Sequence, residues 1–235
     1  MSVLAIIPAA GVGVRMGRGT PKQFLSIEGV PIFVHTLRKF AASAAIDEII
    51  LALRREDMDR AQTDIERERF SKPVRLVGGG PTRQETVARA LAEASPGTEV
   101  VLVHDAVRPF IDPGMIRRLV DAVREDGAAI FGIPSVDTVK QVERLDITGT
   151  IPRERIVLAQ TPQGFRYEIL REAYERATQD GFVATDESSL VERLGYPVKV
   201  LMGTDRNIKI TKPSDLPLAR LYIAQERGQE QCTEE

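Results

Sequence analysis

Cysteine is nearly absent from this sequence, which has one, Cys232, in the polar segment at residues 229–235. A single cysteine excludes an internal disulfide and a cysteine-based metal cluster, and it is typical of a reducing compartment. Long apolar runs are missing as well. The first residues contain no basic segment, and their apolar stretch is too short for a signal peptide or a membrane span. We therefore expect a cytoplasmic protein that makes no contact with a membrane.

An excess of charge of one sign is also missing. The 32 Lys and Arg residues stand against 34 Asp and Glu residues, which gives a net charge of −2. No basic surface of the kind that binds nucleic acid is indicated, so any anionic ligand must be met by local groups. The 235 residues, of which 43% are hydrophobic, suit one domain. We place this domain at residues 1–228, with a flexible tail at 229–235.

Short apolar runs alternate along the chain with longer segments of helical period. This pattern predicts an α/β fold with a mostly parallel sheet and helices on both faces. The expected strands lie at residues 3–7, 48–53, 74–77, 99–104, 128–134 and 198–202.

Helix signals lie between these runs. Apolar residues recur at helical spacing in segments 32–40 and 116–123, which predicts helices that pack on the core. Thr82 and Glu85 have the spacing of a capping box, which places a helix start just after three glycines. Residues 185–187 are interpreted as another helix N-cap, with ligand contact as the alternative.

Residues 136–160 do not follow this alternation of strand and helix signals. Two β-like runs, 138–142 and 155–159, flank the polar span 143–149 and predict a protruding hairpin, or β-arm. Because a two-stranded ribbon is only marginally stable alone, we expect it to pack on the same ribbon of a second subunit. The alternative is a hairpin that lies on its own domain.

The first predicted strand ends in a loop of small residues that begins at Pro8. Such a loop lets backbone N–H groups approach an anion closely. It is not a P-loop, since no matching string occurs, and the dinucleotide fingerprint fails because Met16 replaces its third glycine. Arg15 and Lys22 bring two cations to the strand end, so the loop predicts a triphosphate site, with a simple tight connection as the alternative.

Another acid and arginine follow the predicted strand at 99–104. Asp105 suits Mg²⁺, a cation that prefers carboxylate and phosphate oxygens, and Arg108 suits a phosphate. The alternative is an internal ion pair between these two side chains. His104 and His35 are isolated from other candidate catalytic groups, and we interpret both as structural, hydrogen-bonded histidines.

Further charged residues lie at the base of the hairpin and after the last predicted strand, where Asp205 is a second candidate for Mg²⁺. Cations outnumber acids at these strand ends and loops, which predicts a pocket for a polyanion. The cations are Arg15, Lys22, Arg108, Lys140, Arg153 and Lys209, and the acids are Asp105, Asp137 and Asp205.

Six ordered motifs resemble one family. They are Pro8-Ala-Ala-Gly-x-Gly-x-Arg-Met, Pro21-Lys-Gln, Val103-His-Asp-Ala-x-Arg-Pro, Asp137-Thr, Gln160-Thr-Pro-Gln and Asn207-Ile-Lys. Together they resemble the 2-C-methyl-D-erythritol 4-phosphate cytidylyltransferases, over residues 3–222. The resemblance implies a Rossmann-like nucleotidyltransferase fold and a homodimer joined by β-arms. It also implies that CTP and methylerythritol phosphate give CDP-methylerythritol and pyrophosphate, in the non-mevalonate route to isoprenoids.

The resemblance also implies roles for individual residues. Arg15, Lys22, Arg153 and Lys209 would be catalytic, and Asp105 and Asp205 would lie near Mg²⁺. The nucleotide would be bordered by Pro8, Ala9, Ala10, Gly11, Gly13, Gly80, Thr86 and Asp105. The methylerythritol phosphate would be held by Arg108, Thr138, Lys140, Arg153, Thr161 and Lys209. Arg153 and Thr161 would come either from the same subunit or from the arm of its neighbour.

The chemistry of the residues agrees with this activity, because an acceptor phosphate is already a nucleophilic anion near neutral pH and needs little help from a general base. What remains for the protein is positioning and charge neutralisation. Two alternatives stay open: a ribitol 5-phosphate cytidylyltransferase, and a nucleotide-binding module without catalysis. A nicotinamide-dependent oxidoreductase is disfavoured by Met16.

Overall fold

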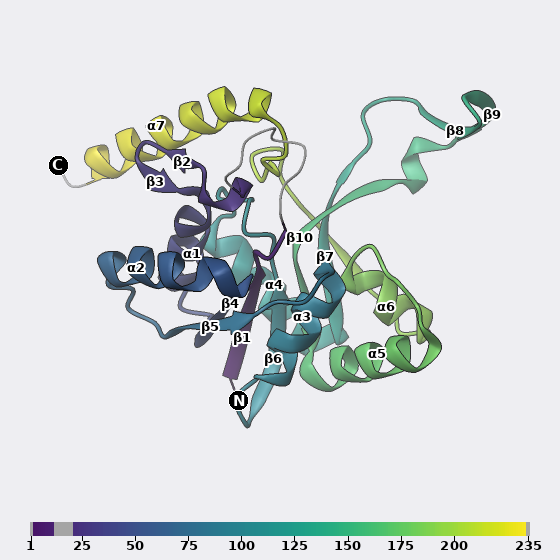
Figure 1. Ribbon diagram of the computed structural model, residues 1–235. Helices are drawn as coiled ribbons and strands as arrows, with labels where there is room; N and C mark the ends of the chain where they lie inside the picture. Colours follow the sequence, from purple (N-terminus) through teal and green to yellow (C-terminus); the bar gives the residue numbers. More distant parts are fainter. Residues whose placement is uncertain (1, 12–20, 234–235) are drawn as a thin grey trace.

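The structure is a computed structural model, which describes residues 2–11 and 21–228 and the backbone of residues 229–233. In this part of the chain, seven strands pair into one central sheet (Figure 1). They are β1 (Ser2–Pro8), β4 (Glu48–Leu53), β5 (Val74–Gly78), β6 (Thr98–Val103), β7 (Ala128–Pro134), β10 (Val157–Arg166) and β11 (Lys199–Met202). The six strands predicted from the sequence are confirmed to within one residue at each end.

The order across the sheet is β11-β7-β10-β6-β1-β4-β5. Strand β10 runs antiparallel to its neighbours β6 and β7, and the other six strands run parallel to one another. The expected mostly parallel sheet is therefore confirmed, with one reversed strand inside it. The register of β10 against β7 shifts between Gln160 and Gln163, and the Thr161–Pro162 peptide bond there is cis.

Helices cover both faces of the sheet, as expected. One face is covered by α1 (Ile32–Ala42), α2 (Met58–Glu68) and α4 (Pro113–Asp126), and the other by α3 (Arg83–Ala92), α5 (Tyr167–Asp180) and α6 (Glu187–Arg193). Alternate side chains of each strand supply the two cores: Ala5 and Ile7 of β1 pack under the first set, and Leu4 and Ile6 under the second. This is the burial expected of strands that are covered on both faces.

The helix starts predicted after the three glycines and at residues 185–187 are also confirmed. Thr82 accepts a hydrogen bond from the backbone N–H of Glu85 and completes a capping box at the start of α3. Asp112 caps α4 by accepting from the backbone N–H groups of the residues that follow Pro113. At α6 the cap is Asp186, whose carboxylate accepts from the backbone N–H of Ser189 at 3.1 Å.

The last helix lies over a small hairpin and a third apolar cluster. The hairpin pairs β2 (Ser26–Ile27) with β3 (Val30–Pro31), and the cluster includes Ile27, Ile210 and Ile223. The helix, α7 (Leu216–Thr233), includes the backbone of residues 229–233. The flexible tail expected at residues 229–235 stays a prediction. Since Gln and Glu have high helix propensity and no proline follows Gly228, the polar composition did not end the helix.

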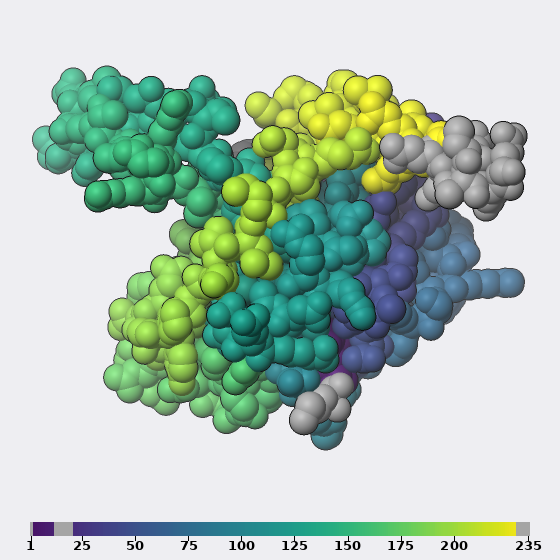
Figure 2. Space-filling model, turned by 180° about the vertical axis from the view of Figure 1, so that it is seen from behind, coloured from purple at the N-terminus to yellow at the C-terminus, as the bar shows by residue number. Residues whose placement is uncertain are grey.

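A β-arm stands away from the body of the molecule, as predicted (Figures 1 and 2). Its strands are β8 (Val139–Glu143) and β9 (Asp146–Ile151), so the prediction of its second strand at 155–159 was wrong. Residues 157–159 instead begin β10 in the central sheet. The error arose because β9 is polar and because the turn at Arg144 and Leu145, both with positive φ, lacks the Asn or Gly that usually marks such a turn.

None of the helices in residues 2–11 and 21–233 is both long and apolar enough to cross a membrane.

Candidate active site

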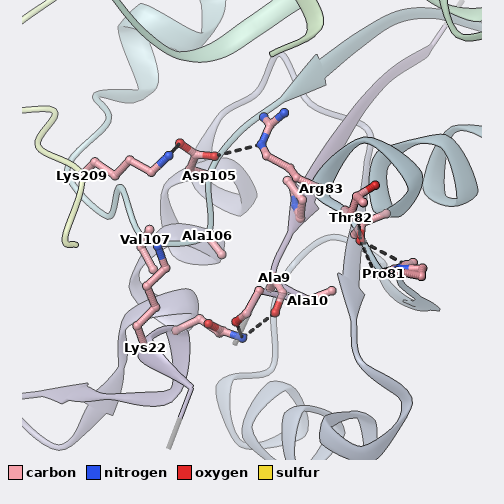
Figure 3. Close-up of a pocket in the computed structure, with 15 residues that line it drawn as sticks. Ala9, Ala10, Lys22, Pro81, Thr82, Arg83, Asp105, Ala106, Val107 and Lys209 are labelled. Carbon is pink, nitrogen blue, oxygen red and sulfur yellow. Dashed lines mark hydrogen bonds and ion pairs between the residues drawn. The ribbon is translucent and has the colours of Figure 1, made fainter. Parts of the chain in front are cut away.

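A pocket of about 600 Å³ opens where β1, β5 and β6 end (Figure 3). This is the edge at which open α/β sheets bind ligands, because loops from several parallel strands meet there. The pocket is lined by Pro8, Ala9, Ala10, Gly11, Lys22, Gln23, Gly80, Pro81, Thr82, Arg83, Thr86, Asp105, Ala106, Val107 and Lys209. Most of the residues expected to border the nucleotide are therefore brought together. Gly13 and Arg15 lie outside the described residues.

Two loops approach each other closely at one wall of the pocket. A Cβ atom on Gly79 would lie 2.7 Å from the Cβ of Ala10 and 3.0 Å from Oγ1 of Thr86. On Gly80 it would lie 2.5 Å from the Cβ of Glu85. Glycine is therefore required at both positions by the lack of space. Oγ1 of Thr86 also accepts a hydrogen bond from the backbone N–H of Gly80 at 3.1 Å, which fixes this wall.

The loop after β1 is held by Gln23, which belongs to the Pro21-Lys-Gln motif but was assigned no role from the sequence. Its Nε2 donates to the carbonyl oxygens of Ala9 at 2.5 Å and Gly11 at 3.2 Å. Gln23 lies in a 3₁₀ turn at Lys22–Phe24, from which Lys22 extends along the pocket toward Val107 (Figure 3). The turn therefore fixes both the backbone of the loop and the position of the lysine.

Asp105 is the acidic centre of the pocket, and three cations surround its buried carboxylate. Oδ2 lies 2.8 Å from Nζ of Lys209 and 3.5 Å from Nε of Arg108, and Oδ1 lies 3.5 Å from Nε of Arg83 (Figure 3). Burial alone would raise the pKa of Asp105, but the charges of Arg83, Lys209 and Arg108 outweigh it and hold that pKa far below its ordinary value. Asp105 is therefore ionised at neutral pH. The alternative Asp105–Arg108 ion pair is present in this structure.

The two histidines are buried and hydrogen-bonded, which confirms their structural interpretation. Nε2 of His104 lies 2.9 Å from the carbonyl oxygen of Arg108, and its Nδ1 lies 3.1 Å from Oγ1 of Thr161. Burial lowers the pKa of His104 to about 4, so the ring is neutral at pH 7. Nε2 then carries the proton and donates it to the carbonyl, and Nδ1 accepts from the threonine. His35 contacts the carbonyl oxygen of Ile27 through Nε2 at 3.1 Å.

Thr161 lies beneath the pocket wall and does not line the pocket. Its side chain is buried, and Oγ1 accepts a hydrogen bond from the backbone N–H of Asp105 at 3.0 Å. With its donation to His104, this hydroxyl joins β10 to the loop after β6. In this chain, Thr161 thus contacts the segment that carries Asp105, whereas the family resemblance implies contact with the acceptor.

A second pocket, of about 930 Å³, adjoins the first. Lys209 lines both, so this side chain stands at their junction. Arg108 and Asp205 line only the second, which separates Asp205 from Asp105, its expected partner at Mg²⁺. The other lining residues are Ile133, Leu158, Ala159, Gln160, Asn207, Ile208, Thr211, Ser214, Asp215 and Leu218. Among the described residues, no three His, Cys, Asp or Glu side chains form a group that could hold a metal.

The predicted acceptor-binding residues of the arm line neither pocket in this single chain. Nζ of Lys140 donates to Oγ1 of Thr150 at 2.7 Å, and Arg153 donates to the carbonyl oxygen of Val136 at 2.8 Å. Thr138 lies at the base of the arm and is exposed. The structure therefore does not bring these three residues together with Arg108 and Lys209.

Arg83 is another functional candidate that sequence analysis missed. It lies within the capping box of α3, so the sequence indicated only a helix start at this position. In the structure its side chain reaches the pocket and Asp105 (Figure 3). Its second partner, Glu187, lies 104 positions away in the sequence. No local pattern could have paired the two.

Comparisons with known proteins agree on one family. The model of a family described as 2-C-methyl-D-erythritol 4-phosphate cytidylyltransferase matches residues 3–225. A relative of that name from Acidobacterium capsulatum is 52% identical to this chain, and the match covers 96% of this chain and 98% of the relative. Another, from Solibacter usitatus, is 51% identical, and the match covers 96% of this chain and 97% of that relative.

Solved structures give the same result. The fold is similar to 4-diphosphocytidyl-2C-methyl-D-erythritol synthase from Anaerococcus prevotii, with a TM-score of 0.85 and 33% identity over 95% of this chain and 96% of that one. It is also similar to 2-C-methyl-D-erythritol 4-phosphate cytidylyltransferase from Thermus thermophilus, with a TM-score of 0.76 and 37% identity over 94% and 98%.

Proposed function

The chain belongs to the 2-C-methyl-D-erythritol 4-phosphate cytidylyltransferase family, and we infer that it is a nucleotidyltransferase that catalyses the reaction of that name. It transfers the cytidylyl group of CTP to methylerythritol phosphate and releases pyrophosphate, in the non-mevalonate route to isoprenoids. One observation of the geometry carries this assignment: two pockets meet at a single lysine, Lys209. This arrangement suits a reaction between two phosphates, because one cation can then stabilise the charge that both anions bring together.

The first pocket suits the nucleotide. Its walls of glycine, alanine and proline let a base and ribose lie close to the backbone, while Lys22 and Lys209 meet the phosphates. The second pocket suits the acceptor, whose phosphate would be met by Arg108 and Lys209.

The reaction requires no proton transfer from the protein. An oxygen of the acceptor phosphate attacks the α-phosphorus of CTP, a P–O bond forms, and the bond to the β-phosphate breaks, so that pyrophosphate leaves with the electron pair. His104 takes no part, because both of its nitrogens are engaged and its ring is neutral. Lys22, Lys209 and Arg15 are proposed to stabilise the charge that develops around the α-phosphate.

Mg²⁺ is the proposed cofactor, and the donor set fits it in part. Asp105 is an ionised carboxylate in the nucleotide pocket, and oxygen ligands of this kind suit Mg²⁺, which usually binds one or two carboxylates together with substrate phosphates. Asp205, in the second pocket, is the other candidate. When bound, the ion would neutralise phosphate charge.

A homodimer through the β-arm is the proposed assembly. The arm is a two-stranded ribbon that exposes apolar side chains: Leu145 is 95% exposed and Ile147 is 65% exposed. A ribbon of this kind is marginal alone and gains stability by packing on a partner. The arm of a second subunit would then bring Lys140 and Arg153 to the acceptor pocket.

The test is a pyrophosphate-release assay with Mg²⁺ that crosses CTP, ATP, GTP and UTP with methylerythritol phosphate and ribitol 5-phosphate. We expect turnover to be highest with CTP and methylerythritol phosphate. Lys22→Ala and Arg15→Ala should each lower kcat at least about a hundredfold, the scale for loss of one preorganised donor to a transition state. Arg67→Ala, which removes an exposed cation on α2, is the control. Faster turnover with ribitol 5-phosphate would contradict the acceptor assignment.

A further inference from the structure

A buried ion pair joins the nucleotide pocket to helix α6. The two terminal nitrogens of Arg83 donate to the two carboxylate oxygens of Glu187 at 2.8 and 2.9 Å. Glu187 is 1% exposed, whereas the side chain of Arg83 is 32% exposed and lines the pocket. The carboxylate is thus fully buried behind a guanidinium that faces the ligand space.

Stability alone does not explain this pair. Removing two charges from water costs free energy that a buried ion pair often fails to recover, so such pairs are weak evidence for stabilisation. Glu187 also accepts a hydrogen bond from the hydroxyl of Tyr174, at 2.9 Å, and is therefore fully committed to fixed partners. An arginine clamped in this way is held in one orientation.

The backbone that carries Glu187 is also fixed. Nε2 of Gln163, on β10, donates to the carboxylate of Asp186 at 2.7 Å, and Oε1 of Gln163 accepts from the backbone N–H of Ser188 at 3.1 Å. These contacts bind the first turn of α6 to the central sheet on both sides of Glu187. The carboxylate therefore cannot follow Arg83 if the arginine moves.

The free edge of Arg83 faces Asp105. Only its Nε approaches that carboxylate, at 3.5 Å, because both terminal nitrogens are taken by Glu187. Asp105 is thus left with one close partner, Lys209, at 2.8 Å (Figure 3). Without the negative charge of Glu187, the planar fork of Arg83 would be free to form a two-point contact with Asp105, which would withdraw that carboxylate from its present position beside Lys209.

We propose that Glu187 is a positioning residue of the nucleotide pocket, which holds Arg83 away from Asp105 and so keeps Asp105 in place for the triphosphate. The inference rests on the proposed function, because the effect is expected on CTP and not on the acceptor. Glu187 contacts neither pocket itself and acts only through Arg83.

The experiment compares Glu187→Gln with the wild-type enzyme. The variant should raise KM for CTP at least about tenfold, the range of one charge-assisted hydrogen bond, with kcat and KM for methylerythritol phosphate changed less than about threefold. The matched control is Glu68→Gln, which breaks another two-point ion pair, with Arg38 at 2.6 and 2.8 Å; neither residue lines the two pockets. This control should leave all three constants unchanged.

A double-mutant cycle tests whether Glu187 acts through Arg83. In an Arg83→Gln background, Glu187→Gln should cause no further rise in KM for CTP. A Glu187→Gln variant with wild-type KM for CTP, or one whose effect is undiminished in that background, would overturn the inference. If Glu187→Gln does not fold, Tyr174→Phe decides: a rise in KM for CTP supports the proposal and an unchanged value refutes it. A wild-type enzyme that releases no pyrophosphate would instead refute the proposed function.

Discussion

Replacing Thr161 by valine removes one buried hydroxyl from the contact between β10 and the loop that carries Asp105. That hydroxyl accepts from the backbone N–H of Asp105 at 3.0 Å and donates to Nδ1 of His104, 3.1 Å away. Valine has the same shape, so the cavity stays filled. The substitution therefore isolates the loss of two hydrogen bonds.

The magnitude follows from the groups left behind. The N–H of Asp105 and Nδ1 of His104 both lose their partners in a buried location. Each buried polar group left without a partner costs about 1–3 kcal/mol, so Thr161→Val should lower the free energy of unfolding by about 2–6 kcal/mol. For a protein of 235 residues this corresponds to a fall in Tm of roughly 5–20 °C.

The assay is urea unfolding followed by circular dichroism, with kinetics measured at a temperature where each variant is folded. Thr161→Ser keeps the hydroxyl and should recover most of the lost stability. Thr63→Val, on the exposed face of α2, loses one hydrogen bond of 3.0 Å to a backbone carbonyl and should cost far less. KM for methylerythritol phosphate should stay within about twofold of the wild-type value in Thr161→Val, because the substitution removes no contact with the substrate.

One result would refute this reasoning. If Thr161→Val unfolds like the wild type but raises KM for the acceptor tenfold, the hydroxyl contacts the acceptor, as the family resemblance implies. The stability of the protein would then not depend on the hydrogen bonds of Thr161 with Asp105 and His104.

Three further predictions address the two pockets and the buried histidine. Lys209→Met should lower kcat about 100- to 1000-fold in the pyrophosphate-release assay, because one preorganised donor to the transition state is lost. A change in kcat of less than about threefold would contradict the position of Lys209 between two phosphates. Gly79→Ala would put a Cβ 2.7 Å from that of Ala10 and should raise KM for CTP about tenfold or more, as overpacking costs about 1–3 kcal/mol; Gly228→Ala, with open space around it, should not. The pKa of His104 is about 4 in the folded protein against an ordinary 6.5, so the unfolded chain binds the extra proton, and stability should fall by up to about 3 kcal/mol as pH drops from 7 to 4. Urea unfolding across that range should show this loss, and His104→Gln should flatten it.

The central sheet could be predicted from sequence because its strands are buried on both faces. A run such as residues 49–53 is apolar throughout, and its pattern shows no helical period. The arm lacks this signal, since β9 is exposed and polar, and its turn at Arg144 and Leu145 has no marker residue. Its second strand was therefore placed too far along the chain.

The active site divides along a similar line. Asp105 and Lys209 were found because charged residues that follow predicted strands must meet at one edge of a parallel sheet. Gln23 and Glu187 lie in segments that the sequence singled out, but their roles were not predicted, because those roles depend on contacts with a backbone loop and with an arginine 104 positions away. Thr161 belongs to a recognised motif, but only the structure shows which atoms its hydroxyl contacts.

The reversed direction of β10 explains why so much of the site depends on one short stretch. Parallel strands only end at the ligand edge, whereas an antiparallel strand begins there, and its shifted register at residues 160–163 presents side chains to both neighbours. Gln160 donates to the carbonyl oxygen of Thr204, Thr161 holds the loop of Asp105, and Gln163 holds α6. The two loops carry Lys209 and Asp105, and α6 carries Glu187. One short stretch of β10 therefore contacts segments on both the proposed acceptor side and the proposed nucleotide side of the site.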